Sequence, residues 1–356
     1  MSAESNLPGF EAGLKGSSEK VAEFVEPTGG LKKIQGWLHR TPSAVPLIVL
    51  VFALIVFGLL NGNFFKAATI STILQQIVIV GILGCAQSVV ILTAGIDLSV
   101  GAIAVFTSVL MGQFTFRYGV PPAASIVLGL MAGTAMGAIN GALISKMRLP
   151  PFIVTLGTWQ IILAGNFIYS ANETIRSQDI EIAAPSLQFW GRTMTLFGIR
   201  ITIGVFLLVG LVMIMAYVLR QTAWGRHVYA VGDDPEAAML AGVKVDRTLI
   251  QVYALAGFFC AFAGWVMIGR FGSVSPAAST GVLGNIQSIT AVVIGGISLF
   301  GGRGSIMGMF FGALIVGVFE MGLRLIGTDP QWTFLLIGVL IISAVAVDQW
   351  IRKASA

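Results

Sequence analysis

The feature that most constrains this chain is a series of long apolar segments separated by short polar ones. A helix needs about 20 apolar residues to cross the roughly 30 Å hydrocarbon core of a bilayer. In lipid, only helices and closed barrels satisfy every backbone hydrogen bond. Ten segments approach this length: 45–62, 72–94, 98–115, 123–145, 151–170, 200–219, 248–269, 286–300, 305–325 and 331–350. The sequence predicts an all-α polytopic membrane protein with about ten transmembrane helices.

Composition agrees with a chain that lies in the lipid bilayer. Hydrophobic residues make up 56% and charged residues only 10%, whereas soluble domains carry about 25% charged residues. The net charge of +5 does not indicate nucleic acid, because the basic residues sit at the ends of apolar segments, where they orient a chain in a membrane. The two cysteines, Cys85 and Cys260, fall inside apolar runs and indicate no metal site.

Charge also predicts the orientation of the segments. An even number of spans places both termini on one side, and lysine and arginine are enriched in cytoplasmic loops. Taking that side as cytoplasmic assigns it 14 of the 21 basic residues: Lys15, Lys20, Lys32, Lys33, Arg40, Lys146, Arg148, Arg220, Arg226, Lys244, Arg247, Arg303, Arg352 and Lys353. Trp332 and Trp350 bracket the last segment as interfacial anchors.

Three regions follow from this topology. Residues 1–44 form a cytoplasmic tail, in which Leu31, Ile34 and Leu38 share one face of an expected interfacial helix; a disordered tail is the alternative for residues 1–16. Residues 45–350 form the transmembrane domain, and residues 351–356 a second cytoplasmic tail. The segment 169–202 is the longest on the opposite side, and forms a docking surface for an outside partner or only a connection.

The cytoplasmic loop 220–247 contains a helix with clear local signals. In AWGRHVYAVGDDPEAAMLAGVKVDR, Asp234 suits an N-cap, Pro235 the first helical position, and Glu236 the positive end of the helix dipole. Gly242 can end the helix. The predicted helix, 235–241, either docks into a cleft of a soluble partner or is only a solvated connector.

Three motifs carry a resemblance to a known family. The stretch GRHVYAVGDDPEAAMLAGV resembles the coupling-helix region of ribose-type sugar permeases, subunits of binding-protein-dependent ABC transporters. LTAGIDLSVGAI and GGISLFGGRGS resemble that family's signatures in the first and second halves, in the same order. Glu236, Ala237 and Ala238 match the Glu-Ala-Ala core of many such permeases. The resemblance covers residues 45–350.

The resemblance implies a permease subunit that carries a monosaccharide, such as ribose, xylose or fructose, across the bacterial inner membrane. It implies three partners: a second copy of the chain, a cytoplasmic ATPase with two fused nucleotide-binding halves, and a periplasmic sugar-binding protein. The coupling residues would be Asp234, Pro235, Glu236, Ala237, Ala238, Met239 and Leu240. No GxxxxGK[ST], HExxH or GxSxG motif is present, so we expect no enzyme, cofactor or metal in this chain, with ATP used by the partner.

The two glycine-rich motifs also resemble each other. Residues 94–98 precede residues 295–299 by 201 positions, and Gln87-Ser88 echoes Gln287-Ser288. Interrupted apolar segments repeated in two halves of a transporter indicate a central pathway, because irregular backbone in a membrane must be buried or line water. The sequence therefore predicts two pseudo-repeated halves.

Asp97 lies between two apolar runs, where a charge facing lipid costs about 2.5 kcal/mol or more. It can cap a helix starting at Leu98 through the amides of Ser99 or Val100, or it can line the pathway and bind sugar hydroxyls. The third alternative makes it the coupling carboxylate of a proton- or ion-driven secondary transporter, which is the main rival function.

Other polar side chains inside the spans are candidates for the pathway. Sugar sites combine amides with aromatic faces, which Trp159 beside Gln160 offers. The alternative is interhelical hydrogen bonding, worth about 0.6 kcal/mol per contact. The candidate pathway residues are Gln87, Asp97, Ser99, Asn140, Trp159, Gln160, Asn285, Gln287 and Ser298. The glycines of residues 129–142 have the spacing of close helix packing.

Overall fold

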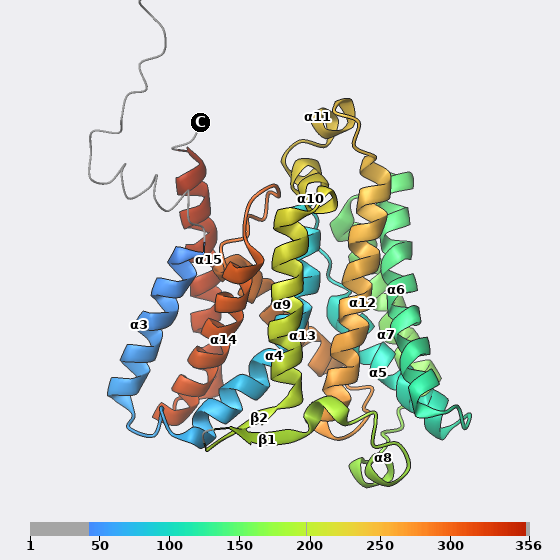
Figure 1. The fold of residues 1–356 in the computed structure, drawn as a ribbon, viewed down its shortest axis with the longest axis vertical. Coiled ribbons are helices and arrows are strands. Elements are labelled where there is room, and N and C mark those ends of the chain that lie inside the picture. The colour runs from blue at the N-terminus through green and yellow to red at the C-terminus, as the bar shows by residue number, and fades with distance from the viewer. Residues whose placement is uncertain (1–42, 197, 354–356) are drawn as a thin grey trace, which may run out of the picture. The chain divides into compact units, whose positions relative to one another are not determined.

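A computed structural model describes residues 43–196 and 198–353, and most of them are helical. The predicted interfacial helix lies outside the described residues. The long helices of the bundle (Figure 1) are α3 (Ala44–Leu60), α4 (Ala67–Leu92), α5 (Val100–Phe116), α6 (Pro122–Lys146), α7 (Pro151–Ser170), α9 (Ile203–Gln221), α12 (Val245–Phe271), α13 (Ala278–Ile294), α14 (Ile306–Ile326) and α15 (Pro330–Lys353). The last helix therefore continues past the predicted boundary at residue 350.

Nine of these helices lie on predicted segments, and α13 overlaps its predicted segment only in part. Within the described part of the chain, six are long and apolar enough to cross a membrane, namely α4, α6, α7, α9, α12 and α14. Shorter apolar stretches lie in the other four, α3, α5, α13 and α15. A chain of this kind passes through a bilayer several times.

The predicted span 286–300 is wrong. Helix α13 begins eight residues earlier, at Ala278, and ends at Ile294. Its first turns carry Ser279, Thr280 and Asn285, which lower the local hydropathy, although Asn285 is buried. At the other end Gly296 has a φ of +78°, a conformation that breaks a helix and that glycine adopts without strain. Helix α5 likewise begins at Val100 rather than at residue 98.

The all-α prediction also needs a correction. Strands β1 (Thr193–Leu196) and β2 (Ile199–Thr202) form an antiparallel hairpin in which Leu196 pairs with Ile199. A short helix, α8 (Ser177–Ala183), and a 3₁₀ turn (Phe189–Gly191) precede it. The segment 169–202 is thus a folded cap on one end of the bundle, while α10 (Ala223–Asp233) and α11 (Pro235–Leu240) lie at the other end (Figure 1).

Helix α4 is the centre of the core. From Ile77 to Leu92 every one of its residues is buried, as expected for a helix surrounded by others. Helices α9, α12, α13 and α14 all pack against it. A helix buried on all sides positions the segment that follows it, so the loop after Leu92 has a fixed starting point.

Helices α6 and α12 make the most extensive contact in the bundle, along a glycine seam. A Cβ atom added to Gly137 would overlap the carbonyl oxygen of Tyr253, and one added to Gly257 would overlap that of Gly133. The backbones therefore touch, as the small-residue spacing of residues 129–142 predicts.

Candidate coupling segment and translocation pathway

Helix α11 forms as the sequence predicts, and its N-cap is confirmed. The Asp234 Oδ1 atom accepts hydrogen bonds from the amides of Glu236 at 2.9 Å and Ala237 at 3.0 Å. Pro235 is the first helical residue, and Gly242 has a φ of +87° beyond the end. The helix is one residue shorter than predicted, with Ala241 at its C-cap.

Most of the predicted coupling residues form an exposed surface. Met239 is 61% and Leu240 87% exposed, and Asp234, Pro235, Glu236 and Ala237 are also exposed. Ala238 is the exception at 5%, so it faces the chain itself and supports the helix. The result is a small apolar surface with two carboxylates, Asp234 and Glu236, at the end of the bundle where α10 lies (Figure 1).

Helix α10, which the sequence did not predict, packs directly on both glycine-rich motifs. A Cβ atom at Gly232 would overlap the carbonyl oxygen of Leu92 and lie 2.7 Å from the amide nitrogen of Gly302. The same Gly302 amide donates to the Leu92 carbonyl at 3.0 Å. A Cβ at Gly301 would lie 2.5 Å from the Gly232 carbonyl oxygen and 2.8 Å from the Ala94 side chain. At these glycine positions there is no room for a side chain between α10 and the two motif loops, 93–99 and 295–305.

Tyr229 adds a polar link from α10 to the second motif. Its hydroxyl donates to the carbonyl of Gly304 at 3.0 Å. Burial raises the pKa of this phenol above its ordinary value, so the hydroxyl keeps its proton at physiological pH and remains a donor. Gly232 and Tyr229 lie within the family-like stretch 225–243, but their contacts join parts of the chain far apart in sequence.

The first motif loop places Asp97 in a hydrogen-bonded turn. Its Oδ1 atom accepts from the Ser99 amide at 2.8 Å and from the Ser99 hydroxyl at 2.6 Å. The Asn140 amide donates to the same hydroxyl at 2.9 Å. Asp97, Ser99 and Asn140 are at most 1% exposed. The predicted bond to the Ser99 amide is present, although the helix starts two residues later than the cap prediction assumed.

Asn285 joins the two halves of the chain. From α13 its Oδ1 atom accepts from the Gly101 amide at 3.0 Å, and its amide donates to the Leu98 carbonyl. The Gly101 amide is one of the first-turn N–H groups that have no partner within the helix, and the Leu98 carbonyl directly precedes the helix. Nearby, a Cβ atom at Gly101 would overlap the carbonyl oxygen of Gly281. The second half thus caps and closely contacts the broken segment of the first.

The internal echo extends to the backbone. Helix α4 ends with the Gly95 amide bonded to the Val90 carbonyl, and α13 ends with the Ile297 amide bonded to the Val292 carbonyl. In both turns the residue before that amide, Ala94 or Gly296, has a positive φ. These equivalent positions are 202 residues apart, one more than the sequence alignment of 201. The repeated motifs are therefore two copies of one helix-ending turn.

Other pathway candidates are buried at separate places in the bundle. Gln87 is fully buried, and among the described residues neither of its amide atoms has a hydrogen-bond partner. Gln287 donates to Glu320 at 3.1 Å. Ser298 is 2% exposed and belongs to the second motif loop, where its amide donates to the Arg303 carbonyl at 3.0 Å.

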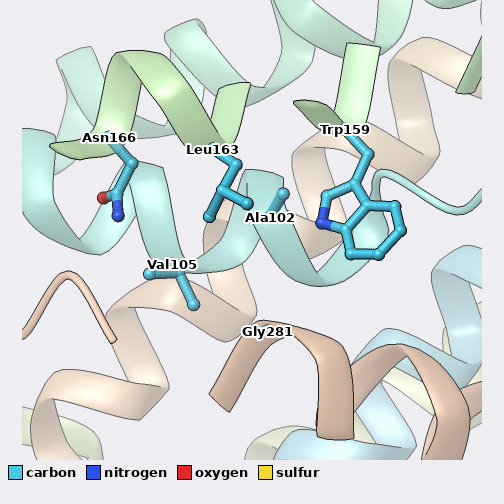
Figure 2. Close-up of a pocket in the computed structure, with 6 residues that line it drawn as sticks. All are labelled: Ala102, Val105, Trp159, Leu163, Asn166 and Gly281. Carbon is cyan, nitrogen blue, oxygen red and sulfur yellow. The ribbon is translucent and has the colours of Figure 1, made fainter. Parts of the chain in front are cut away.

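Trp159 and Gln160 do not form the predicted sugar-binding pair. Trp159 lines a small cavity together with Ala102, Val105, Leu163, Asn166 and Gly281 (Figure 2). Gln160 is exposed and is absent from that lining, because successive residues of a helix point about 100° apart. The cavity holds about 10 Å³, which is space for about one water molecule. A monosaccharide does not fit there in this conformation.

The structure is a helical bundle in which a surface helix contacts two interrupted segments, and this arrangement is typical of membrane transport components. The family model "branched-chain amino acid transport system / permease component" matches residues 69–345, and the chain belongs to this family. It is a multi-pass membrane permease component.

Individual relatives are sugar-import permeases. The chain is 65% identical over 349 residues to the fructose import permease protein FrcC of Rhizobium meliloti, covering 98% of this chain and 96% of that protein. It is 35% identical to the ribose import permease protein RbsC of Bacillus subtilis, covering 87% and 93%. For RbsC of Escherichia coli K12 the values are 33%, 88% and 95%. No solved structure matches the chain. The likeness to ribose-type sugar permeases is confirmed.

Proposed function

We propose that this chain is the permease subunit of an ABC importer that carries fructose across the bacterial inner membrane. The sequence left ribose, xylose and fructose open. The 65% identity to a fructose import permease, over 98% of the chain, favours fructose over the sugars of relatives near 35%. Membership of a permease-component family favours this function over a secondary transporter with Asp97 as its coupling carboxylate.

The observation that carries the mechanism is the contact of α10 with both motif loops. A partner that moves the exposed face of α11 also moves α10, which Asp234 joins to it as the C-cap of one helix and the N-cap of the next. Because the backbones of Gly232, Leu92 and Gly302 touch, α10 cannot shift without moving the loops. The interrupted ends of α4 and α13 would then open or close the pathway.

The proposed assembly has two copies of this chain. One coupling surface per chain would engage each of two nucleotide-binding halves, fused in one ATPase polypeptide as the family resemblance implies. The sequence has no phosphate-binding loop of the GxxxxGK[ST] type, so the ATPase would bind the nucleotide. A periplasmic sugar-binding protein would deliver fructose to the opposite end.

The proposed orientation places α10, α11 and both termini in the cytoplasm, with all ten long helices crossing the membrane. Basic residues at α10 and α11 support it, because Arg220, Lys244 and Arg247 flank these helices and Arg226 lies within α10. Such residues favour the cytoplasmic side. The β1–β2 hairpin and α8 would then face the periplasm.

Reconstitution tests the proposed function. Proteoliposomes holding this chain alone should neither hydrolyse ATP nor concentrate D-fructose. Adding the ATPase inside and the binding protein outside should produce ATP-dependent uptake. Accumulation by the chain alone, driven by an imposed proton or sodium gradient, would overturn the proposal in favour of secondary transport.

A further inference from the structure

Four helices bring charged and amide side chains together inside the apolar bundle. The Arg270 guanidinium of α12 donates to Gln75 Oε1 of α4 at 2.6 Å. The Gln287 amide of α13 donates to Glu320 Oε2 of α14 at 3.1 Å. Gln76 of α4 hydrogen-bonds to the same carboxylate. We refer to these five residues as the outer polar cluster.

The cluster lies toward the end of the bundle that carries the β1–β2 hairpin. Helix α4 begins beside β2, and the last turn of α12 packs against the 3₁₀ turn at Gly191. Arg270 is the penultimate residue of α12, and Glu320 lies six residues before the end of α14. Gln75 and Gln287 lie eight and nine residues after the starts of their helices. At 1.5 Å per residue, the last three are about 9 to 14 Å inside the bundle.

Four of the five side chains of the cluster are only partly buried. Gln287 is 9% exposed, whereas Gln75, Gln76, Arg270 and Glu320 are only half-buried. A charged group within a span costs about 2.5 to 3.5 kcal/mol against lipid, so charges at this depth face a water-filled cavity or a polar partner. A transport pathway supplies such a space.

The chemistry of the outer polar cluster fits a polyol. A guanidinium only donates hydrogen bonds and a carboxylate only accepts them, while a sugar hydroxyl does both. Among the described residues, the guanidinium bonds to Gln75 and the carboxylate to Gln76 and Gln287, not to each other. Arg270 and exposed Arg324, one turn beyond Glu320, both act on this carboxylate electrostatically.

We propose that the outer polar cluster is the first site at which the permease binds the hydroxyl groups of the monosaccharide after its release by the binding protein. The proposal rests on the proposed function and adds Gln75, Gln76, Arg270 and Glu320 to Gln287, the one residue of the cluster among the sequence-based pathway candidates. Sugar hydroxyls would replace the glutamine amides as hydrogen-bond partners of the guanidinium and the carboxylate, so both charged groups would remain hydrogen-bonded.

Two conservative variants test the site, Arg270→Lys and Glu320→Gln. Arg270→Lys keeps a positive charge but removes the planar guanidinium. Glu320→Gln keeps a polar side chain but removes the negative charge. Matched controls at the same end are Arg117→Lys, whose arginine donates to the Tyr169 carbonyl at 3.0 Å, and Glu181→Gln on exposed α8. All four are reconstituted with the ATPase and the binding protein, and uptake of D-fructose and D-ribose is measured together with ATP hydrolysis.

We expect both cluster variants to lower fructose import per ATP hydrolysed by about fivefold or more, equivalent to about 1 kcal/mol. They should also change the ratio of fructose to ribose uptake, while ATP hydrolysis stimulated by the binding protein stays within about twofold. The controls should match the wild-type chain.

Three outcomes overturn the site. The first is an unchanged sugar ratio with unchanged import per ATP. The second is a lower melting temperature with an unchanged sugar ratio, because that result assigns the cluster to helix packing. The third is competition of uptake by inorganic phosphate, which assigns the positive charges to an anion. If the wild-type assembly imports no sugar, the proposed function itself fails and the site falls with it.

Discussion

At the scale of single residues, Asp97 shows how a chain keeps a carboxylate inside a membrane. Its Oδ1 atom takes two hydrogen bonds from one neighbour, Ser99, and Asn140 then donates to the Ser99 hydroxyl. Asp97 is therefore the acceptor at the end of a short chain of donors. Its geometry is that of a turn-forming residue, and a sugar contact would need this turn to rearrange.

Substitution of Asp97 separates these roles. Asp97→Asn should keep much of the fructose uptake, because an amide oxygen accepts the same two bonds and asparagine caps nearly as well as aspartate. Asp97→Leu should lose most of it, since two buried donors of Ser99 lose an acceptor at a cost of about 1 to 3 kcal/mol each. Uptake and the yield of monodisperse protein are measured together.

The control for this pair is Asp246→Leu, at an exposed aspartate in the first turn of α12, which should leave uptake unchanged. Equal and complete loss in Asp97→Asn and Asp97→Leu, with uptake in the wild type collapsing when the proton gradient is removed, would contradict the structural role.

At the scale of elements, α10 and α11 have different parts in the proposed coupling. Helix α11 exposes Met239 and Leu240 with one carboxylate, whereas Val228, Val231 and Gly232 of α10 are buried against the bundle. One helix offers a surface to a soluble partner, and the other contacts the motif loops. Changes in the two helices should therefore fail in different ways.

Glu236→Lys should disrupt docking. The change reverses the charge at the N-terminal end of α11, where a negative charge is favoured, and it places a wrong charge against the ATPase. We expect about tenfold less ATPase to co-purify, with about tenfold less uptake, and normal membrane insertion. Glu181→Lys, on the exposed short helix α8 at the other end, is the matched control. Normal co-purification and uptake would refute the docking role of α11.

Gly232→Ala should leave docking of the ATPase intact but uncouple ATP hydrolysis from fructose import. The added methyl group would overlap the Leu92 carbonyl, and overpacking of this kind costs about 1 to 3 kcal/mol. The ATPase should still co-purify, while fructose imported per ATP hydrolysed falls. Gly210→Ala in α9, where nothing lies within 4 Å of the new methyl group, should behave as wild type. An unchanged amount of fructose imported per ATP in Gly232→Ala would contradict a role of the α10 contact in the mechanism.

Elements with local signals could be predicted from the sequence, and elements fixed by distant contacts could not. Helix α11 was found because Asp234, Pro235 and Gly242 act within a few residues of one another. Helix α13 was misplaced because its first turns are polar, and one of their residues, Asn285, is buried where it caps the other half of the chain. The contact of Gly232 with Leu92 and Gly302 joins three distant segments, and local patterns carry no trace of it.

At the scale of the whole molecule, the two ends of the bundle differ in what they present. One end carries α10 and α11, and the other carries α8 and the β1–β2 hairpin (Figure 1). Both free cysteines, Cys85 and Cys260, are fully buried. The two native cysteines should therefore not react with a maleimide in labelling experiments on orientation.

Variants with one added, exposed cysteine check the proposed topology. Ile182→Cys on α8 and Leu240→Cys on α11 replace side chains that are 85% and 87% exposed. A membrane-impermeant maleimide added to intact spheroplasts should label Ile182→Cys alone, and labelling of Leu240→Cys should require disrupted membranes. The unchanged chain should not react in either preparation. The reverse pattern would invert the proposed orientation.

The glycine seam between α6 and α12 makes these two helices move as one rigid unit. Because their backbones touch, they cannot slide past each other and must tilt together. Helix α12 follows the coupling segment directly and runs 27 residues, about 40 Å at 1.5 Å per residue. A tilt of about 3° about the end that follows α11 would move the far end by roughly 2 Å. Arg270 lies at that far end. A small displacement of α12 by the ATPase would therefore move the Arg270 guanidinium away from a bound sugar hydroxyl, and this movement would need no rearrangement of side chains.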